Sequence, residues 1–212
     1  MQPTNDLLQE NLGRVYSAVS PGELERAYDV WAATYDHDMT EDLGWGGPEE
    51  AAKVLAERVS IAAPVLDFGA GTGLVGQSLH ARGFTRVSAA DLSREMLARA
   101  EARGVYASLH QVRADALLPF GDDQFEGLVS VGVLTQAHAA PDCMREWVRV
   151  VRPGGVVVFT LRPDLAEALG YAPMARALEQ EGRWGKEHES ADLEGFRRLQ
   201  SKPYHVLTYR VR

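Results

Sequence analysis

The chain has 212 residues, 45% of them hydrophobic and 25% charged, which suits one well-packed domain better than two. A formal net charge of −8 disfavours a nucleic-acid partner, because proteins that bind phosphates usually concentrate Lys and Arg on one face. No apolar run reaches the length of a membrane span, the first residues lack a secretory pattern, and the single cysteine excludes an internal disulfide, so we expect a cytoplasmic protein that does not span a membrane.

The first sixty residues indicate helices. Residues 1–20 mix polar and apolar positions and are expected to form a loose helix or a tail. From Pro21 onward the pattern is helical, and four side chains recur at steps of three and four and so share one face: Tyr28, Trp31, Ala32 and Tyr35. That face either packs against the edge of a sheet or closes over a ligand, and both interpretations stay open. A Gly-rich connection at 40–48 then leads into a helix over 49–60, with Pro48 at its start.

A glycine-rich loop follows the first predicted strand. The segment VLDFGAGTG (65–73) begins with apolar residues, continues through Asp67 and three alternating glycines, and turns into a helical run. Glycine tolerates positive φ and has no side chain, so such a loop lets backbone N–H groups approach a ligand at a helix N-terminus. Two phosphate-binding patterns fit less well, because a dinucleotide fingerprint requires Gly where Leu74 stands and a Walker A loop requires Lys where Gln77 stands.

A second carboxylate, Asp91, ends the next predicted strand, RVSAAD (86–91). It lies about 20 positions beyond Gly71, where nucleoside-binding α/β sites hold a ribose diol. The alternative is that Asp91 merely caps the following helix, which starts near Ser93. Carboxylates at two successive strand ends, Asp67 and Asp91, suit an amino group or ribose hydroxyls but not a pyrophosphate. The pattern therefore indicates a nucleoside that carries an amino acid.

The remaining sequence alternates strands and helices, which is typical of a parallel sheet. A third strand is predicted within 107–114, and a fourth at 127–131 leads into an exit loop that ends at His138. A helix over 142–150 precedes the turn RPGG and a fifth buried strand, VVVFTL. Residues 163–195 are expected to be rich in helix, and two strand-like runs follow, FRRLQSKPY and HVLTYRVR.

Five motifs occur in a fixed order over about two thirds of the chain: the DxGxGxG loop, AADLSREML, RADALLPF, FEGLVSVGVL and VRPGGVVVFTL. Together they resemble the class I S-adenosylmethionine-dependent methyltransferases. Within that family, YDVWAATYDHDM, VGVLTQAH and LEQEGRWGK are similar to segments of the methyltransferase-like 27 proteins of the Williams–Beuren syndrome region. The resemblance implies a Rossmann-like α/β fold whose seven-stranded sheet is mostly parallel, with an antiparallel last strand and helices on both faces. It also implies a single domain with an N-terminal helical lid (1–60), a cofactor-binding core (61–162), and a substrate-side insert followed by a terminal strand pair (163–212).

The same resemblance implies S-adenosylmethionine as cofactor, S-adenosylhomocysteine as product, and no metal. Asp91 would hold the ribose hydroxyls, Asp115 the adenine amino group, and Tyr35 would lie near the methionine part. Met96 also fits a core position, and Asp115 also fits a solvated loop. The expected cofactor-binding residues are Tyr35, Asp67, Gly69, Ala70, Gly71, Thr72, Gly73, Asp91, Leu92, Ser93, Met96, Asp115, Ala116, Val131 and Gly132.

The expected reaction is methyl transfer to a small molecule. An amine or hydroxyl acceptor must lose a proton, and histidine is the usual proton acceptor near neutral pH. His138 and His37 are the two candidates, although isolated histidines more often lie at the surface or pack. Cys143 is interpreted as a small buried residue rather than a nucleophile, and no ligand spacing indicates a metal site. Two alternatives stay open: a cofactor-binding regulatory or partner module without transferase activity, and methylation of protein or RNA.

Overall fold

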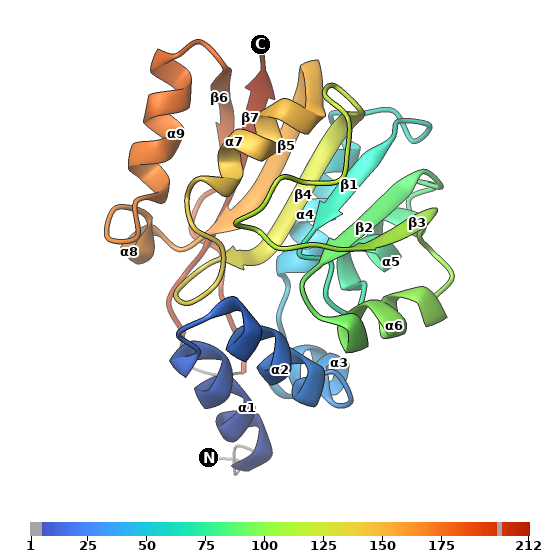
Figure 1. Ribbon diagram of the computed structural model, residues 1–212, viewed down its shortest axis with the longest axis vertical. Helices are drawn as coiled ribbons and strands as arrows, with labels where there is room; N and C mark the ends of the chain where they lie inside the picture. The colour runs from blue at the N-terminus through green and yellow to red at the C-terminus, as the bar shows by residue number, and fades with distance from the viewer. Residues whose placement is uncertain (1–5, 199–200) are drawn as a thin grey trace.

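The computed structural model describes residues 6–198 and 201–212, which contain a seven-stranded sheet (Figure 1). The strands are β1 (Val65–Phe68), β2 (Val87–Asp91), β3 (Ser108–Gln111), β4 (Phe125–Leu134), β5 (Val151–Leu161), β6 (Trp184–Glu189) and β7 (His205–Val211). Their order is β3-β2-β1-β4-β5-β7-β6. Strands β1 to β5 pair in parallel, and β7 is antiparallel to both of its neighbours. The predicted fold class is confirmed.

Helices cover both faces of this sheet, as predicted (Figure 1). One face carries α4 (Gly47–Ala56), α5 (Leu74–His80) and α6 (Arg94–Ala102), and the other carries α7 (Cys143–Val150) and α9 (Tyr171–Gln180), with the short α8 (Pro163–Ala166) before α9. Alternation along the strands explains the two layers, because Val65 and Val129 join the core under α4 and α5 while Leu66 and Leu128 join the core under α7 and α9. Strands buried on both faces therefore read as continuous apolar runs.

The N-terminal segment forms a further helical layer, which we call the N-terminal lid (residues 6–42). It consists of α1 (Asp6–Ser17), α2 (Pro21–Trp31), α3 (Tyr35–His37) and the π-helix η1 (Asp38–Asp42). Figure 1 shows these helices beyond the carboxyl end of β4. The side chain of Ser20 caps α2 by accepting the N–H of Glu23 at 3.3 Å. Leu8, Leu24 and Trp31 form an apolar cluster with Met96 of α6, so the lid packs against the layer that holds the sheet. Residues 1–5 of the expected loose helix or tail lie outside the described residues.

The terminal strand pair differs from the prediction. The run FRRLQSKPY (196–204) was expected to be its first strand, but that strand is β6, and 196–204 contributes isolated bridges at Phe196 and Tyr204, while residues 199 and 200 lie outside the described residues. The segment WGKEHE misleads because its charges suggest a solvated helix or loop. On an edge strand, charged side chains are tolerated and discourage pairing with other chains. Helix within 163–195 is accordingly confined to α8 and α9.

A smaller difference concerns the predicted turn RPGG, which falls inside β5. The pairing of β4 with β5 shifts register there, from Phe125↔Val151 to Gly127↔Val156. Gly154 adopts a φ of +82°, which allows the irregularity. The strand therefore starts five residues before VVVFTL, at Val151.

Candidate functional site

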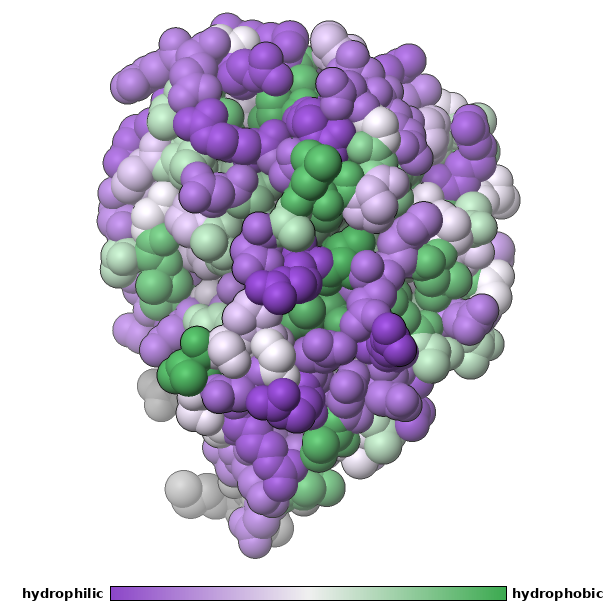
Figure 2. All heavy atoms as spheres, viewed as in Figure 1, coloured by the Kyte–Doolittle hydropathy of each residue, from purple (hydrophilic) through white to green (hydrophobic). Residues whose placement is uncertain are grey.

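A cavity of about 500 Å³ lies between the carboxyl ends of the central strands and the N-terminal lid. This is the edge at which open α/β sheets bind ligands, and the volume falls within the usual range of small-molecule pockets. The cavity is lined by the glycine loop, by the ends of β2 and β4, by the loop after β3, by the lid, and by residues of the segment 195–204. Figure 2 shows a mostly hydrophilic surface on the face viewed, with apolar patches near its middle.

The glycine loop presents bare backbone to the cavity. Gly69 and Gly71 both line it and adopt φ values of +78° and +53°, a region that side chains disfavour. A Cβ on Gly69 would lie 2.1 Å from a methyl carbon of Val133, whereas a Cβ on Gly71 would meet no atom within 4 Å. A side chain at position 69 would therefore clash with Val133. At position 71 there is space for a side chain, but the backbone conformation favours glycine.

Asp91 fixes the loop from the neighbouring strand. Its Oδ2 accepts the N–H of Gly71 at 2.7 Å, and its Oδ1 accepts the N–H of Ser93 at 2.9 Å. Burial raises the pKa of this carboxyl group, and its bonds from backbone N–H groups oppose that rise. The cap of α6 is supplied by the hydroxyl of Ser93, which accepts the N–H of Met96 at 3.1 Å. Asp91 lines the cavity, where its remaining acceptor capacity is available to hydroxyl donors.

Asp67 is fully buried and lies outside the cavity lining. Its Oδ2 accepts the phenol hydroxyl of Tyr106 at 2.6 Å, while its Oδ1 has no hydrogen-bond partner. Burial raises the pKa of Asp67 to about 7, although the bond from Tyr106 opposes this. Tyr106 also accepts the N–H of Gly76 at 3.1 Å, so Asp67 and Tyr106 together are attached to the first turn of α5. Sequence analysis missed Tyr106, which belongs to none of the five motifs.

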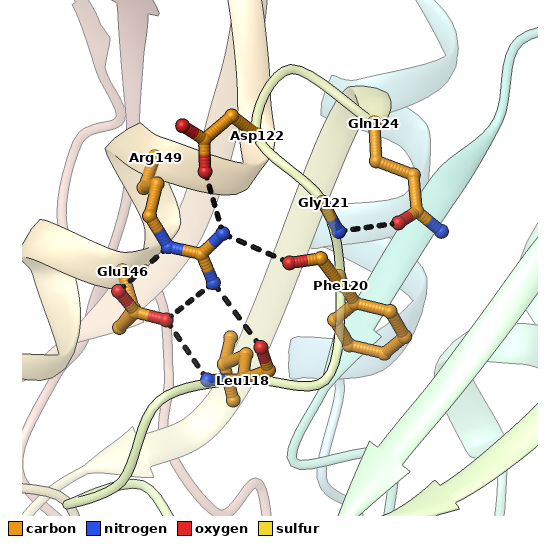
Figure 3. Close-up of polar contacts among 7 residues, drawn as sticks. All are labelled: Leu118, Phe120, Gly121, Asp122, Gln124, Glu146 and Arg149. Atoms are coloured by element: carbon orange, nitrogen blue, oxygen red, sulfur yellow. Dashed lines mark hydrogen bonds and ion pairs between the residues drawn. The ribbon is translucent and has the colours of Figure 1, made fainter.

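The loop after β3 forms another wall of the cavity. Asp115 lines the cavity in an exposed position, and its two oxygens accept bonds from Arg113 at 2.9 and 2.7 Å, which lower its pKa. Further along, the loop is attached to α7 by Arg149, which donates to the carbonyl oxygens of Phe120 at 2.8 Å and Leu118 at 3.2 Å (Figure 3). Arg149 also pairs with Glu146 at 2.6 Å. These bonds hold residues 118–120, which have no regular secondary structure, against α7.

The lid contributes three aromatic rings, of which Tyr28 and Trp31 are stacked and Tyr35 meets both edge to face. Trp31 lies with its ring centroid 6.1 Å from that of Tyr28 and 4.8 Å from that of Tyr35, and all three side chains line the cavity. The indole N–H of Trp31 donates to Asp38 at 2.7 Å. The rings thus pack on one another and not on the edge of the sheet, and they line the cavity, so closure over a ligand stays a prediction.

The two histidine candidates lie in different environments. His138 lines the cavity, its Nδ1 lies 2.7 Å from the carbonyl oxygen of Gln136, and its Nε2 lies 2.5 Å from the hydroxyl of Tyr28. A carbonyl oxygen only accepts, so Nδ1 carries the proton and Nε2 is an acceptor. Burial lowers the pKa of His138, which keeps the ring neutral. His37 is exposed, outside the lining, and 3.7 Å from Asp42.

The end of β4 and the exit loop after it are held by side chains that sequence analysis did not single out. Tyr171 of α9 donates its hydroxyl hydrogen towards the carbonyl oxygens of Thr135 at 3.1 Å and Ala139 at 2.7 Å. Gly132 donates its N–H to the hydroxyl of Thr160 at 2.8 Å. No local pattern marks these pairs, because each joins segments that are 28 or more residues apart.

Comparison with known proteins agrees with this geometry. A family profile described as a methyltransferase domain matches residues 66–159. Methyltransferase-like protein 27 from Homo sapiens is 33% identical over 165 residues, which cover 74% of this chain and 66% of the human protein. The chain belongs to the class I S-adenosylmethionine-dependent methyltransferases. The match covers 66% of the length of the human protein, and only 38% and 48% of the lengths of two further curated relatives.

Solved structures support the methyltransferase fold. A TehB-like SAM-dependent methyltransferase from Corynebacterium glutamicum superposes with a TM-score of 0.66 at 17% identity, covering 88% of this chain and 100% of that one. The [4+2]-cyclase SpnF superposes with a TM-score of 0.69 at 18% identity, covering 92% and 97%. At such identities the likeness concerns the fold alone, and the same methyltransferase fold occurs in a protein described as a cyclase.

The expected cofactor-binding residues of this chain divide into two groups. Those that line the cavity are Tyr35, Gly69, Gly71, Asp91, Leu92, Met96, Asp115, Val131 and Gly132. Those outside the lining are Asp67, Ala70, Thr72, Gly73, Ser93 and Ala116. Apart from the exposed Ala116, the residues of the second group are buried in the glycine loop, in β1 or at the start of α6. A Cβ on Gly71 or Gly132 would meet no atom within 4 Å, so the bare backbone there leaves space for a ligand and fits the expected cofactor.

Residues 6–198 and 201–212 include no group of three or more His, Cys, Asp or Glu side chains able to hold a metal ion. Within the same ranges, every helix is too short or too polar to cross a bilayer. Cys143 is buried, and burial raises the pKa of its thiol to about 12, which disfavours the reactive thiolate.

Proposed function

We propose that the protein binds S-adenosylmethionine and catalyses methyl transfer to a small molecule. The observation that carries the proposal is the convergence on one cavity of a bare glycine backbone, the carboxylate of Asp91 and the aromatic lid. Asp91 would accept the ribose hydroxyls, Asp115 would take the adenine amino group, and Leu92 with Met96 would contact the ring. The backbone of Gly69 and Gly71 and the ring of Tyr35 would enclose the methionine part.

The bound cofactor would supply an electrophilic methyl group on a positively charged sulfur. The protein's contribution is to hold the acceptor in line with that group and to exclude water. The lid suits this task, because Tyr28, Trp31 and Tyr35 close one side of the cavity with apolar surface. No strong acid is required for a displacement of this kind.

His138 is the proposed proton acceptor. An O–H or N–H acceptor would give its proton to the hydroxyl oxygen of Tyr28, and the proton of Tyr28 would pass to Nε2 of His138 over the existing bond of 2.5 Å. The acceptor atom keeps the electron pair of its broken bond, and His138 gains one positive charge. Gln136 then stabilises the imidazolium through its bond to Nδ1. His37 has no such role in this proposal, because it lies outside the cavity lining.

A small acceptor is favoured by the rest of the cavity. Its remaining walls include the apolar side chains of Leu12, Val15 and Leu24, and Val19 is 88% exposed at the rim. A net charge of −8 disfavours RNA as the acceptor.

We also propose that the protein is cytoplasmic and that its single domain consists of a lid (1–60), a cofactor-binding core (61–162), and a substrate-side insert with the terminal strands (163–212). Within the insert, α8 and α9 lie outside the lining, and residues 195–204 would meet the substrate.

A second candidate is a cofactor-binding module without transferase activity. It is favoured by one observation, that the basic nitrogen of His138 is already bonded to Tyr28. Methylation of a protein chain would require the lid to open, and is the third candidate.

Two measurements on the full chain test the proposal. Calorimetric titration should detect S-adenosylmethionine binding in the micromolar range, and a folded sample without detectable binding would reject it. Formation of S-adenosylhomocysteine should then depend on an added small molecule from a panel of phenols, amines and carboxylates. Binding without turnover on any member of that panel would favour the non-catalytic module.

A further inference from the structure

Arg103 joins three segments that surround the proposed cofactor site from outside. Its Nε donates to the carbonyl oxygen of Thr72 at 2.6 Å, and one terminal nitrogen donates to the side chain of Gln77 at 2.6 Å. The other terminal nitrogen donates to Oδ2 of Asp36. Thr72 belongs to the glycine loop, Gln77 to α5, and Asp36 to α3 of the N-terminal lid. One guanidinium group therefore fastens the lid to the loop and to the helix that follows it.

Asp36 doubles this connection. Its Oδ1 accepts the hydroxyl of Thr72 at 2.5 Å, so both of its oxygens are engaged by residues of the core. The side chain of Arg103 is 19% exposed and that of Asp36 is 46% exposed, so the pair is only partly shielded from water. The stem of Arg103 also packs on the loop, because a Cβ on Gly73 would lie 3.0 Å from its Cδ. Charge-assisted hydrogen bonds of this kind are directional, so they fix the position of the short helix α3 and of the residue next to Asp36.

That neighbour is Tyr35, which directly precedes Asp36 and lines the cavity. A second lid carboxylate also contacts the layer that holds the sheet. Oδ1 of Asp29 accepts the hydroxyl of Ser93 at 2.5 Å, and the N–H of Ser93 in turn donates to Asp91. The lid is thus attached at two neighbouring points, through Asp36 at the glycine loop and through Asp29 just after β2.

We infer that Arg103 is a positioning residue that holds the N-terminal lid closed over the cofactor, so that lid closure and cofactor binding are coupled. The inference rests on the proposed function. Arg103 lies outside the cavity lining and acts through Asp36 and Thr72 rather than by touching the ligand. Because the lid forms one wall of the cavity, a cofactor leaves when the lid moves, and breaking the Arg103–Asp36 pair speeds its release.

The test uses S-adenosylhomocysteine as the probe and the full chain with Arg103→Gln, with Asp36→Asn and with both changes. Each single change should raise the dissociation constant about tenfold, chiefly through a faster dissociation rate. The double variant should lose less than the product of the two single losses, because the residues act as one unit. Arg99→Gln is the matched control, since Arg99 is exposed on α6, the helix that Arg103 follows, and it should bind as the wild type does. Unchanged dissociation rates in both single variants, or fully multiplicative losses, would overturn the inference.

A measurement on the unaltered chain covers the case in which a variant does not fold. Hydrogen exchange should slow on addition of S-adenosylhomocysteine in residues 34–40 of the lid and in residues 72–77 together. Protection confined to residues 72–77 would overturn the coupling. Absence of binding by the wild-type chain would instead count against the proposed function, so the two failures are distinguishable.

Discussion

The hydroxyl of Tyr28 lies 2.5 Å from Nε2 of His138, although 110 residues separate them in the sequence. Tyr28 comes from the N-terminal lid and His138 from the exit loop after β4, so the bond spans the cavity wall. Burial raises the pKa of Tyr28 and lowers that of His138, which leaves both groups neutral at pH 7. A lid residue therefore controls the basic nitrogen of the only proposed proton acceptor.

Tyr28→Phe and His138→Gln should each lower the rate of methyl transfer to a phenol or amine by about 100-fold, because both remove a step of the proton path. Binding of S-adenosylmethionine should change little. The measurement is S-adenosylhomocysteine formation as a function of pH, with His188→Gln as the control, since His188 is exposed on β6. Nitrogen NMR on the wild type should find His138 neutral, with its proton on Nδ1. A proton on Nε2 would contradict the assignment.

Asp91→Ala should weaken binding of S-adenosylmethionine by about 1 to 3 kcal/mol, because hydroxyl donors would lose a charged acceptor in a buried site. The same change releases the N–H groups of Gly71 and Ser93, so folding must be checked by thermal unfolding. Asp115→Ala should cost less, because Asp115 is exposed and already paired with Arg113. Calorimetry compares the two variants, and an unchanged affinity for Asp91→Ala would remove Asp91 from the site.

Asp91 and Asp67 illustrate which features of the site the sequence predicts and which it does not. Both are carboxylates at strand ends next to the glycine loop, and the motif alone treats them alike. Their difference depends on Tyr106, which lies between α6 and β3 and whose hydroxyl donates to Asp67 across 39 residues of sequence. Local periodicity predicts strands, helices and the loop because these depend on near neighbours. Pairs such as Tyr28–His138 and Asp36–Arg103 depend on tertiary packing, and no local pattern encodes them.

Asp67 should make stability fall as the pH rises from about 4 to about 7. Its carboxyl group titrates near pH 3.9 when unfolded, and in the folded protein burial raises its pKa to about 7. Between these values the folded state binds more protons than the unfolded state, so the free energy of unfolding decreases with rising pH. Asp67→Asn removes this contribution while keeping an acceptor for Tyr106. Denaturant unfolding of both proteins at pH 5 and pH 7.5 measures it, and an equal pH dependence would show that Asp67 is ionised throughout.

Gly71→Ala should abolish cofactor binding while leaving the protein folded. The left-handed conformation of Gly71, with φ of +53°, would cost about 1 to 2 kcal/mol with a side chain, and the new Cβ would project into space with no protein atom within 4 Å. Gly104→Ala is the matched control, because Gly104 has a φ of +65°, also has open space around a Cβ, and lies outside the cavity lining. Both variants should lose similar stability in thermal unfolding, but only Gly71→Ala should lose affinity for S-adenosylmethionine in calorimetry. Equal affinities in the two variants would mean that the ligand does not approach the backbone at Gly71, and the proposed placement of the methionine part would be wrong.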